Sequence, residues 1–86
     1  MKGKENHQIY VYLLNEGVDV WRPVDAVKIN ENVYRIVAQN PDPEDEQWEF
    51  NFGDLVRCKE RLSISENRKF LAAYEKVEVE SNQSLI

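Results

Sequence analysis

Apolar positions recur with a period of two over most of the first sixty residues. In QIYVYLL, Ile9, Val11 and Leu13 share one parity, and Tyr10 and Tyr12 share the other. Successive side chains of a strand point to opposite faces, so both faces of this segment are apolar or aromatic. The pattern is typical of a strand that is covered on both sides or that belongs to a small barrel.

The segment GVDVWRPVDAV follows a turn at NEG and changes its apolar phase near its proline. Val20 and Val24 have one parity, whereas Trp21 has the other. A straight strand cannot shift its phase and keep its core face, but a bent or bulged strand can. Pro23 lacks an N–H donor, so it belongs at an edge, a bulge or a corner. We expect a bend here, with Trp21 beside it or at the rim and Arg22 pointing to the other side.

Three further strands are predicted before residue 63. VYRIVAQ alternates, NPDPEDE is a loop because of its prolines and packed charge, and QWEFNF places Trp48, Phe50 and Phe52 on one face. A turn at Gly53 then leads into LVRCKERL. The expected core draws one parity from each strand: Ile9, Val11, Leu13, Val20, Tyr34, Ile36, Trp48, Phe50, Phe52, Val56 and Cys58.

The segment SISENRKFLAAYEKVEVE supports two structures. Ser63 and Glu66 have capping-box spacing, and Phe70 to Val77 fits a helical stripe. SEN also suits a hairpin tip, and the closing alternation of valine with charged residues favours a strand. We predict a sixth strand; the alternative, a β-barrel with a C-terminal helix at about residues 65–77, stays open. The fold class expected is all-β: a small antiparallel barrel of five or six strands.

Composition limits the chain to one domain, residues 1–86, with flexible ends at 1–7 and 81–86. A hydrophobic content of 42% is too high for a disordered chain. The longest apolar run, Ile9 to Leu14, is far too short for a membrane span, and no apolar region suggests a secretory signal. A single cysteine, Cys58, cannot form an internal disulfide and suits a reducing cytoplasm.

Three stretches carry a resemblance to known proteins: VYLLNEGVDVWRPVDAV, VYRI and WEFNFGDLVRCKE. The most particular elements are EGVDVWRPV and WEF followed by GDLVRC. Together, the three stretches cover most of residues 9–62, and this part of the chain resembles small bacterial proteins of unknown function that have SH3-like barrels. The resemblance implies an SH3-like barrel and a bacterial, cytoplasmic setting. It implies no activity and brings no catalytic residues.

Signals for catalysis, cofactors or metals are weak. His7 is the only histidine and has no evident partner for general-base chemistry. Cys58 has an inward parity, opposite to Arg57 and Lys59, which indicates a buried structural cysteine. The loop NPDPEDE, residues 40–46, is called the acidic loop below. It lacks the ligand order and central glycine of a calcium-binding EF-hand. We therefore expect neither an enzyme nor a protein with a cofactor or metal.

The net charge is −5, and residues 41–50 hold five carboxylates without a base. An acidic cluster beside an aromatic side chain suits a basic partner, although many such loops are simply solvated. The candidate binding residues are Trp21, Arg22, Asp42, Glu44, Asp45, Glu46, Trp48 and Glu49. The sequence favours a non-enzymatic protein-interaction module that binds a basic protein, in the manner of an immunity protein or antitoxin.

A second hypothesis depends on the row Arg57, Lys59 and Arg61 and on exposed tyrosines. An SH3-like nucleic-acid or ribosome-associated binding protein could use such side chains for phosphates and for stacking. The net acidic charge disfavours nucleic acid without excluding it. For the row itself, the pattern favours pairing across the sheet with Glu49 and other carboxylates over binding of phosphate. No membrane partner is expected, and a homodimer is compatible with the sequence.

Overall fold

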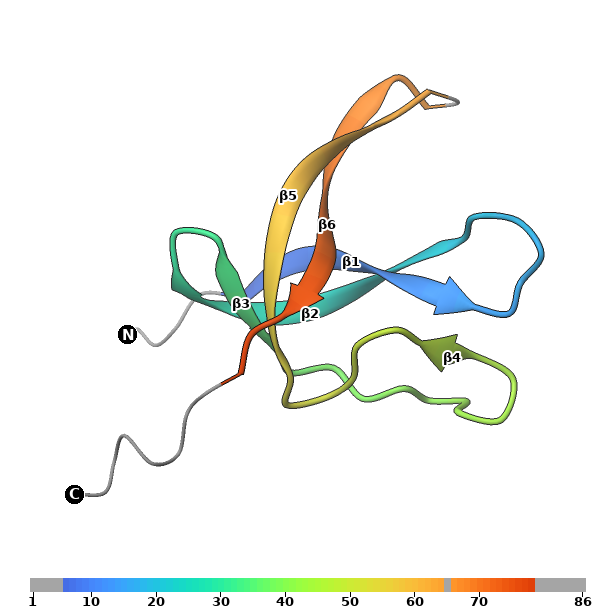
Figure 1. Cartoon of the computed structure of the whole chain (residues 1–86), viewed down its shortest axis with the longest axis horizontal. Helices are drawn as coiled ribbons and strands as arrows, with labels where there is room; N and C mark the ends of the chain where they lie inside the picture. The colour runs from blue at the N-terminus through green and yellow to red at the C-terminus, as the bar shows by residue number, and fades with distance from the viewer. Residues whose placement is uncertain (1–5, 65, 79–86) are drawn as a thin grey trace.

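The computed structural model describes residues 6–64 and 66–78, and all regular structure in them is β-strand (Figure 1). The strands are β1 (Asn6–Leu14), β2 (Trp21–Asn30), β3 (Val33–Ile36), β4 (Gln47–Trp48), β5 (Leu55–Ser63) and β6 (Arg68–Lys76). The predicted all-β class is confirmed. So is the sixth strand, because β6 occupies most of the segment for which a helix was the alternative. The described residues include no helix that could cross a membrane.

Five strands close into a ring in the order β1, β2, β3, β5, β6. Neighbours pair antiparallel except β1 and β6, which meet in parallel at Tyr10 and Ala72. The expectation of a wholly antiparallel sheet is therefore wrong at this seam. Strand direction alternates along an antiparallel ladder, so the first and last of five strands run the same way and close in parallel. The short β4 lies outside the ring and pairs with the end of β1, where Leu13 faces Trp48.

The serine and glutamate that suggested a helix start instead shape the turn between β5 and β6. The Glu66 N–H donates to Ser63 Oγ over 3.4 Å, and Asn67 has a φ of 54°. Serine makes such local bonds in turns as well as at helix starts. The same spacing therefore serves a hairpin, and Figure 1 shows the β5–β6 and β1–β2 hairpins leaving the ring as two diverging arms.

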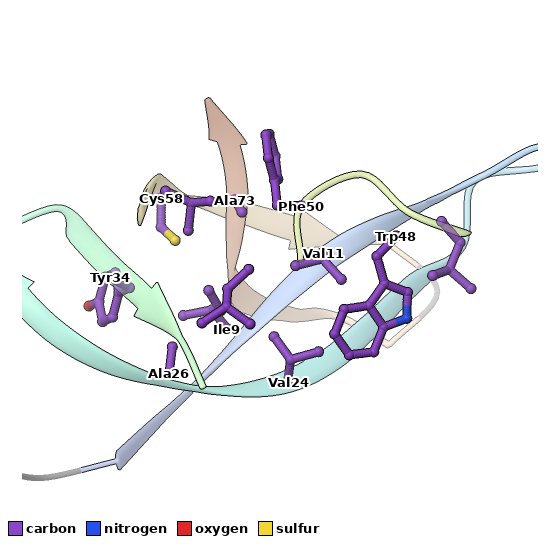
Figure 2. Packing of buried hydrophobic residues seen from close by; sticks show 12 residues of the cluster. Ile9, Val11, Val24, Ala26, Tyr34, Trp48, Phe50, Cys58 and Ala73 are labelled. Carbon is purple, nitrogen blue, oxygen red and sulfur yellow. The ribbon is translucent and has the colours of Figure 1, made fainter. Parts of the chain in front are cut away.

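One core cluster fills the interior, and Figure 2 shows most of its members. Of the residues expected in it, all but two are buried. Val20 is only partly buried but packs against the cluster, whereas Phe52 is 55% exposed, so its assignment to the core is wrong. The cluster also contains Val24, Ala26 and Ala73, which the expected core did not include.

Phe52 is exposed because the chain turns before reaching it. Regular pairing ends at Trp48. Asn51 and Asp54 then close a tight turn, with the Asn51 N–H donating to Asp54 Oδ2 over 2.8 Å and the Asp54 N–H to Asn51 O over 3.0 Å. Gly53 takes a φ of 89°, a left-handed conformation that glycine adopts readily. Alternation from Trp48 therefore predicts Phe50 correctly and fails two residues later.

Pro23 lies in the first half of β2, where only β1 pairs with the strand. Leu13 N–H donates to Val20 O over 2.9 Å, and hydrogen-bonded pairs alternate along an antiparallel ladder. The facing pair Tyr10 and Pro23 is consequently a non-hydrogen-bonded one, in which the proline nitrogen points away from β1. β3 joins β2 only from Ala26 onward. Of the edge, bulge and corner that the sequence allowed, the edge is the one found; pairing with β1 runs without a register shift through Pro23, so no bulge lies there, and the missing N–H leaves no ladder bond unmade.

The N-terminal end of β1 includes residues expected to be flexible. Asn6 and His7 belong to the strand, and the His7 ring packs edge-on against Tyr34 with centroids 5.7 Å apart. The remaining expected flexible ends, residues 1–5 and 81–86, lie outside the described residues.

Candidate functional site

Arg22, Glu46 and Trp48 form a hydrogen-bonded triad that joins β2 to the acidic loop. Arg22 Nε donates to Glu46 Oε1 over 3.1 Å, and a terminal guanidinium nitrogen pairs with Glu46 Oε2. Trp48 Nε1–H donates to Glu46 Oε1 over 3.1 Å. These donors, Arg22 first and Trp48 second, lower the pKa of the Glu46 carboxyl. Glu46 is therefore ionised at neutral pH, and its charge is compensated within the protein.

Asn40 fixes the shape of the acidic loop. Its Oδ1 accepts from the Asp42 N–H over 2.8 Å, and its Nδ2 donates to Glu46 O over 2.7 Å. The Asp42 carbonyl accepts from the N–H groups of Asp45 and Glu46 over 3.0 and 2.8 Å. Asx turns of this kind suit asparagine next to proline. The backbone of the loop is thus a folded turn, and of its carboxylates only Glu46 is tied to β2, through Arg22.

A hollow of about 330 Å³ lies between this loop and the free edge of β2. Pro23, Pro41 and Trp48 contribute apolar surface to it. Two carboxylates, Asp25 and Asp42, also line it, and neither side chain makes a hydrogen bond or ion pair with another described residue. We call this the acidic hollow. It combines apolar walls with these two carboxylates, an arrangement that suits the end of a basic side chain.

Only part of the predicted binding set meets at the acidic hollow. Arg22, Asp42, Glu46 and Trp48 line it together, although they come from segments far apart in the chain. Trp48 is 5% exposed, so it is a wall of the hollow and a core residue instead of an exposed contact at the margin of the loop. Sequence reasoning missed Asp25. The usable signal was its parity, since it shares a strand face with Pro23 at the edge.

The other predicted residues lie elsewhere. Trp21 leaves β2 on the face opposite to Arg22, as expected, and packs against Tyr12 on β1. Glu44 and Asp45 are exposed on the loop and do not line the hollow. Glu49 donates its backbone N–H to Tyr12 O over 2.9 Å, and partial desolvation raises the pKa of its carboxyl.

One cation of the basic row on β5, Arg57, has an acidic partner, and this partner is not Glu49. Arg57 Nε donates to Glu75 Oε1 over 3.0 Å, directly across the β5–β6 ladder. β5 lies between β3 and β6 in the ring, so the segment that carries Glu49 is not its neighbour. The other two cations of the row, Lys59 and Arg61, lie over aromatic rings. The expected cross-strand pairing is confirmed for Arg57 alone.

The residues with catalytic chemistry are held in structural surroundings. Cys58 is buried in the core, and burial raises the pKa of its thiol to about 11. His7 packs on Tyr34 at the start of β1. Among the residues that the structure describes, no group of histidine, cysteine and carboxylate side chains is arranged to hold a metal ion. The acidic hollow is therefore the candidate site that the geometry favours.

Comparisons of this chain with protein-family models, curated proteins and solved structures find no match. The resemblance to small bacterial SH3-like proteins thus remains a prediction from the sequence.

Proposed function

We propose that the protein is a non-enzymatic interaction module that binds a basic segment of a partner protein in the acidic hollow. The observation that carries the proposal is the pair Asp25 and Asp42, two carboxylates beside apolar walls that make no side-chain hydrogen bond or ion pair with the residues that the structure describes. Glu46, the third carboxylate of the hollow, is already compensated by Arg22. A lysine or arginine from outside would supply the cation that the other two lack.

The chemistry of the hollow matches a long basic side chain. Pro23, Pro41 and the edge of Trp48 would contact the aliphatic stem, while Asp25 and Asp42 would receive the charged end. A volume of about 330 Å³ suits one or two inserted side chains rather than a large ligand. Pro23 also prevents the free edge of β2 from donating a hydrogen bond there, which favours recognition through side chains over the addition of a strand.

The exposed carboxylates of the loop have a separate role in this proposal. Glu44 and Asp45 add to the negative field around the hollow without lining it. Such charges accelerate encounter with a basic partner and are screened by salt. An immunity protein or antitoxin bound to a basic toxin is one concrete form of this function. A bacterial, cytoplasmic setting agrees with it and rests on the sequence resemblance.

Two matched double variants test the proposal. Asp25→Asn with Asp42→Asn removes two charges from the hollow, and Glu44→Gln with Asp45→Asn removes two charges from the loop outside it. Glu46 is kept, because its loss would leave Arg22 unpaired. Octalysine and octa-arginine serve as probes, and octaglutamine serves as the neutral reference. Binding is followed by ¹H–¹⁵N NMR at about 150 mM salt, where charges beyond about 8 Å are largely screened.

The basic peptides should shift the Trp48 indole N–H resonance and the backbone amide of Asp42. Each exposed ion pair contributes about 0.2–1 kcal/mol, so the hollow variant should weaken binding by about 2- to 30-fold. The loop variant should change affinity less than twofold at this salt concentration. Equal effects of the two variants, or peptide binding without any shift at Trp48, would show that the hollow is not the binding site.

A further inference from the structure

A second hollow, of about 320 Å³, lies between the β1–β2 and β5–β6 arms that diverge in Figure 1. Tyr10, Trp21 and Phe70 line it, one ring from each of three strands. Phe70 contacts both other rings edge to face, with centroids 5.1 Å from Tyr10 and 5.6 Å from Trp21. We call this the aromatic hollow. None of its three rings belongs to the core cluster, and all three are only partly buried.

Arginine side chains border Phe70 on the same face of the β5–β6 hairpin. Arg61 lies directly opposite Phe70 in the ladder, and its guanidinium stands over the Trp21 ring, 5.3 Å from the centroid. Arg68 precedes Phe70 by two residues, so its side chain leaves β6 on the same face, and it lines the hollow. Lys59 follows along the row, 4.8 Å from the centroid of the Tyr74 ring. The face therefore combines ring surfaces with a line of cations.

Two carboxylates also line the aromatic hollow. Asp19 lines the hollow but accepts a hydrogen bond from the Tyr12 hydroxyl over 2.9 Å, and Glu66 belongs to the hairpin turn. Of the three cations, Arg68 lines the hollow, whereas Arg61 stands over the Trp21 ring and Lys59 over the Tyr74 ring. Cations thus lie beside the rings in a chain whose net charge is −5. A ligand that carries negative charge and planar rings finds both complements here.

We propose that the aromatic hollow and its flanking cations bind a single-stranded nucleic acid. Unpaired bases stack on aromatic side chains, and arginine and lysine contact the phosphates that connect them. Cations two residues apart on a strand are spaced by about 6.6–6.8 Å, close to the spacing of successive phosphates in an extended single strand. A duplex hides the faces of its bases, so the rings favour a single strand. This surface is separate from the acidic hollow and its assignment does not depend on the proposed protein partner.

Binding is tested with fluorescein-labelled oligo(dT) and oligo(rU) of twelve nucleotides and with a duplex of the same length. Fluorescence anisotropy is measured at several salt concentrations between about 50 and 200 mM. We expect binding of the single strands in preference to the duplex. Phe70→Leu keeps an apolar side chain but removes the ring, and should weaken binding by about 5- to 150-fold if a base stacks there.

A charge-matched pair of variants separates the cationic line from overall charge. Arg61→Gln with Arg68→Gln should reduce the slope of log affinity against log salt by about 1.4, since each phosphate contact of a single strand contributes about 0.7. Lys28→Gln with Lys69→Gln removes the same charge outside the face, Lys69 being on the opposite side of β6, and should leave most of the slope intact. Circular dichroism verifies that each variant is folded.

Several outcomes overturn the assignment. They are the absence of oligonucleotide binding at about 50 mM salt, equal effects of the two charge-matched variants, and affinity that Phe70→Leu leaves unchanged. A proline-rich peptide also fits aromatic grooves, through its preformed extended helix. If such a peptide occupied the hollow while oligonucleotides did not bind, the surface would be a peptide site and the nucleic-acid assignment would be wrong.

Discussion

Replacing Trp48 with alanine should lower the free energy of unfolding by about 3–5 kcal/mol, a large part of the 5–15 kcal/mol typical of a domain. Trp48 is 5% exposed and makes up half of the two-residue strand β4. A buried indole removes about 150–250 Å² from water, equivalent to about 4–6 kcal/mol at 25 cal/mol per Å². Alanine keeps a small part of this contact. Loss of the indole N–H also removes one donor to Glu46.

The matched control is Trp21→Ala. Trp21 has the same side chain, but it is partly buried on the outer face and contacts Tyr12 and Phe70 edge to face. Each such ring pair contributes about 0.5–1.5 kcal/mol, so this variant should lose about 1–3 kcal/mol. Urea unfolding followed by far-ultraviolet circular dichroism compares the two, because removing a tryptophan changes the fluorescence itself. If Trp21→Ala destabilised the protein as much as Trp48→Ala, the assignment of Trp48 to the core and Trp21 to the surface would be refuted.

Two further predictions follow from β2 and the core. Pro23→Ala should lower the free energy of unfolding by less than about 1 kcal/mol. The position makes no ladder bond, so the only cost is the greater conformational freedom of the unfolded chain. A shift of the urea midpoint that corresponds to a loss of more than about 2 kcal/mol would contradict the edge geometry. Cys58 should react with iodoacetamide at pH 8 only when urea unfolds the protein, because burial raises the pKa of its thiol to about 11. The folded state then holds this proton to higher pH than the unfolded chain, so stability should fall as pH rises from about 9 to about 11. Rapid labelling of the folded protein at pH 8 would show that the thiol is accessible.

Local alternation predicted the strands well because it depends only on which face each side chain takes. Ile9, Val11 and Leu13 are buried as their shared parity required. Parity cannot say where a strand ends, however, and Phe52 was assigned to the core by continuing a pattern that a turn interrupts. The parallel contact between Tyr10 and Ala72 was equally hidden, because it follows from how many strands close the ring.

The candidate site shows the same limit. The acidic loop and the neighbouring tryptophan were visible as composition, and both do line one hollow. The bond from Arg22 to Glu46 joins residues 24 positions apart, and nothing in the local pattern of either residue indicates it. That bond removes Glu46 from the set of free carboxylates and leaves Asp25 and Asp42 as the residues that can meet a partner.

The two proposed surfaces begin at adjacent residues of β2 yet should act independently. Trp21 belongs to the aromatic hollow, and Arg22 belongs to the acidic one. Asp25 leaves β2 on the same face as Trp21 but four residues further along, about 13 Å away on an extended strand, and charges separated by more than about 8 Å are largely screened at physiological salt. Asp25→Asn with Asp42→Asn should therefore change oligonucleotide affinity by no more than about twofold. Arg61→Gln with Arg68→Gln should likewise change octalysine affinity by no more than about twofold. If each double variant impaired both ligands while the protein stayed folded, one shared surface would have to replace the two.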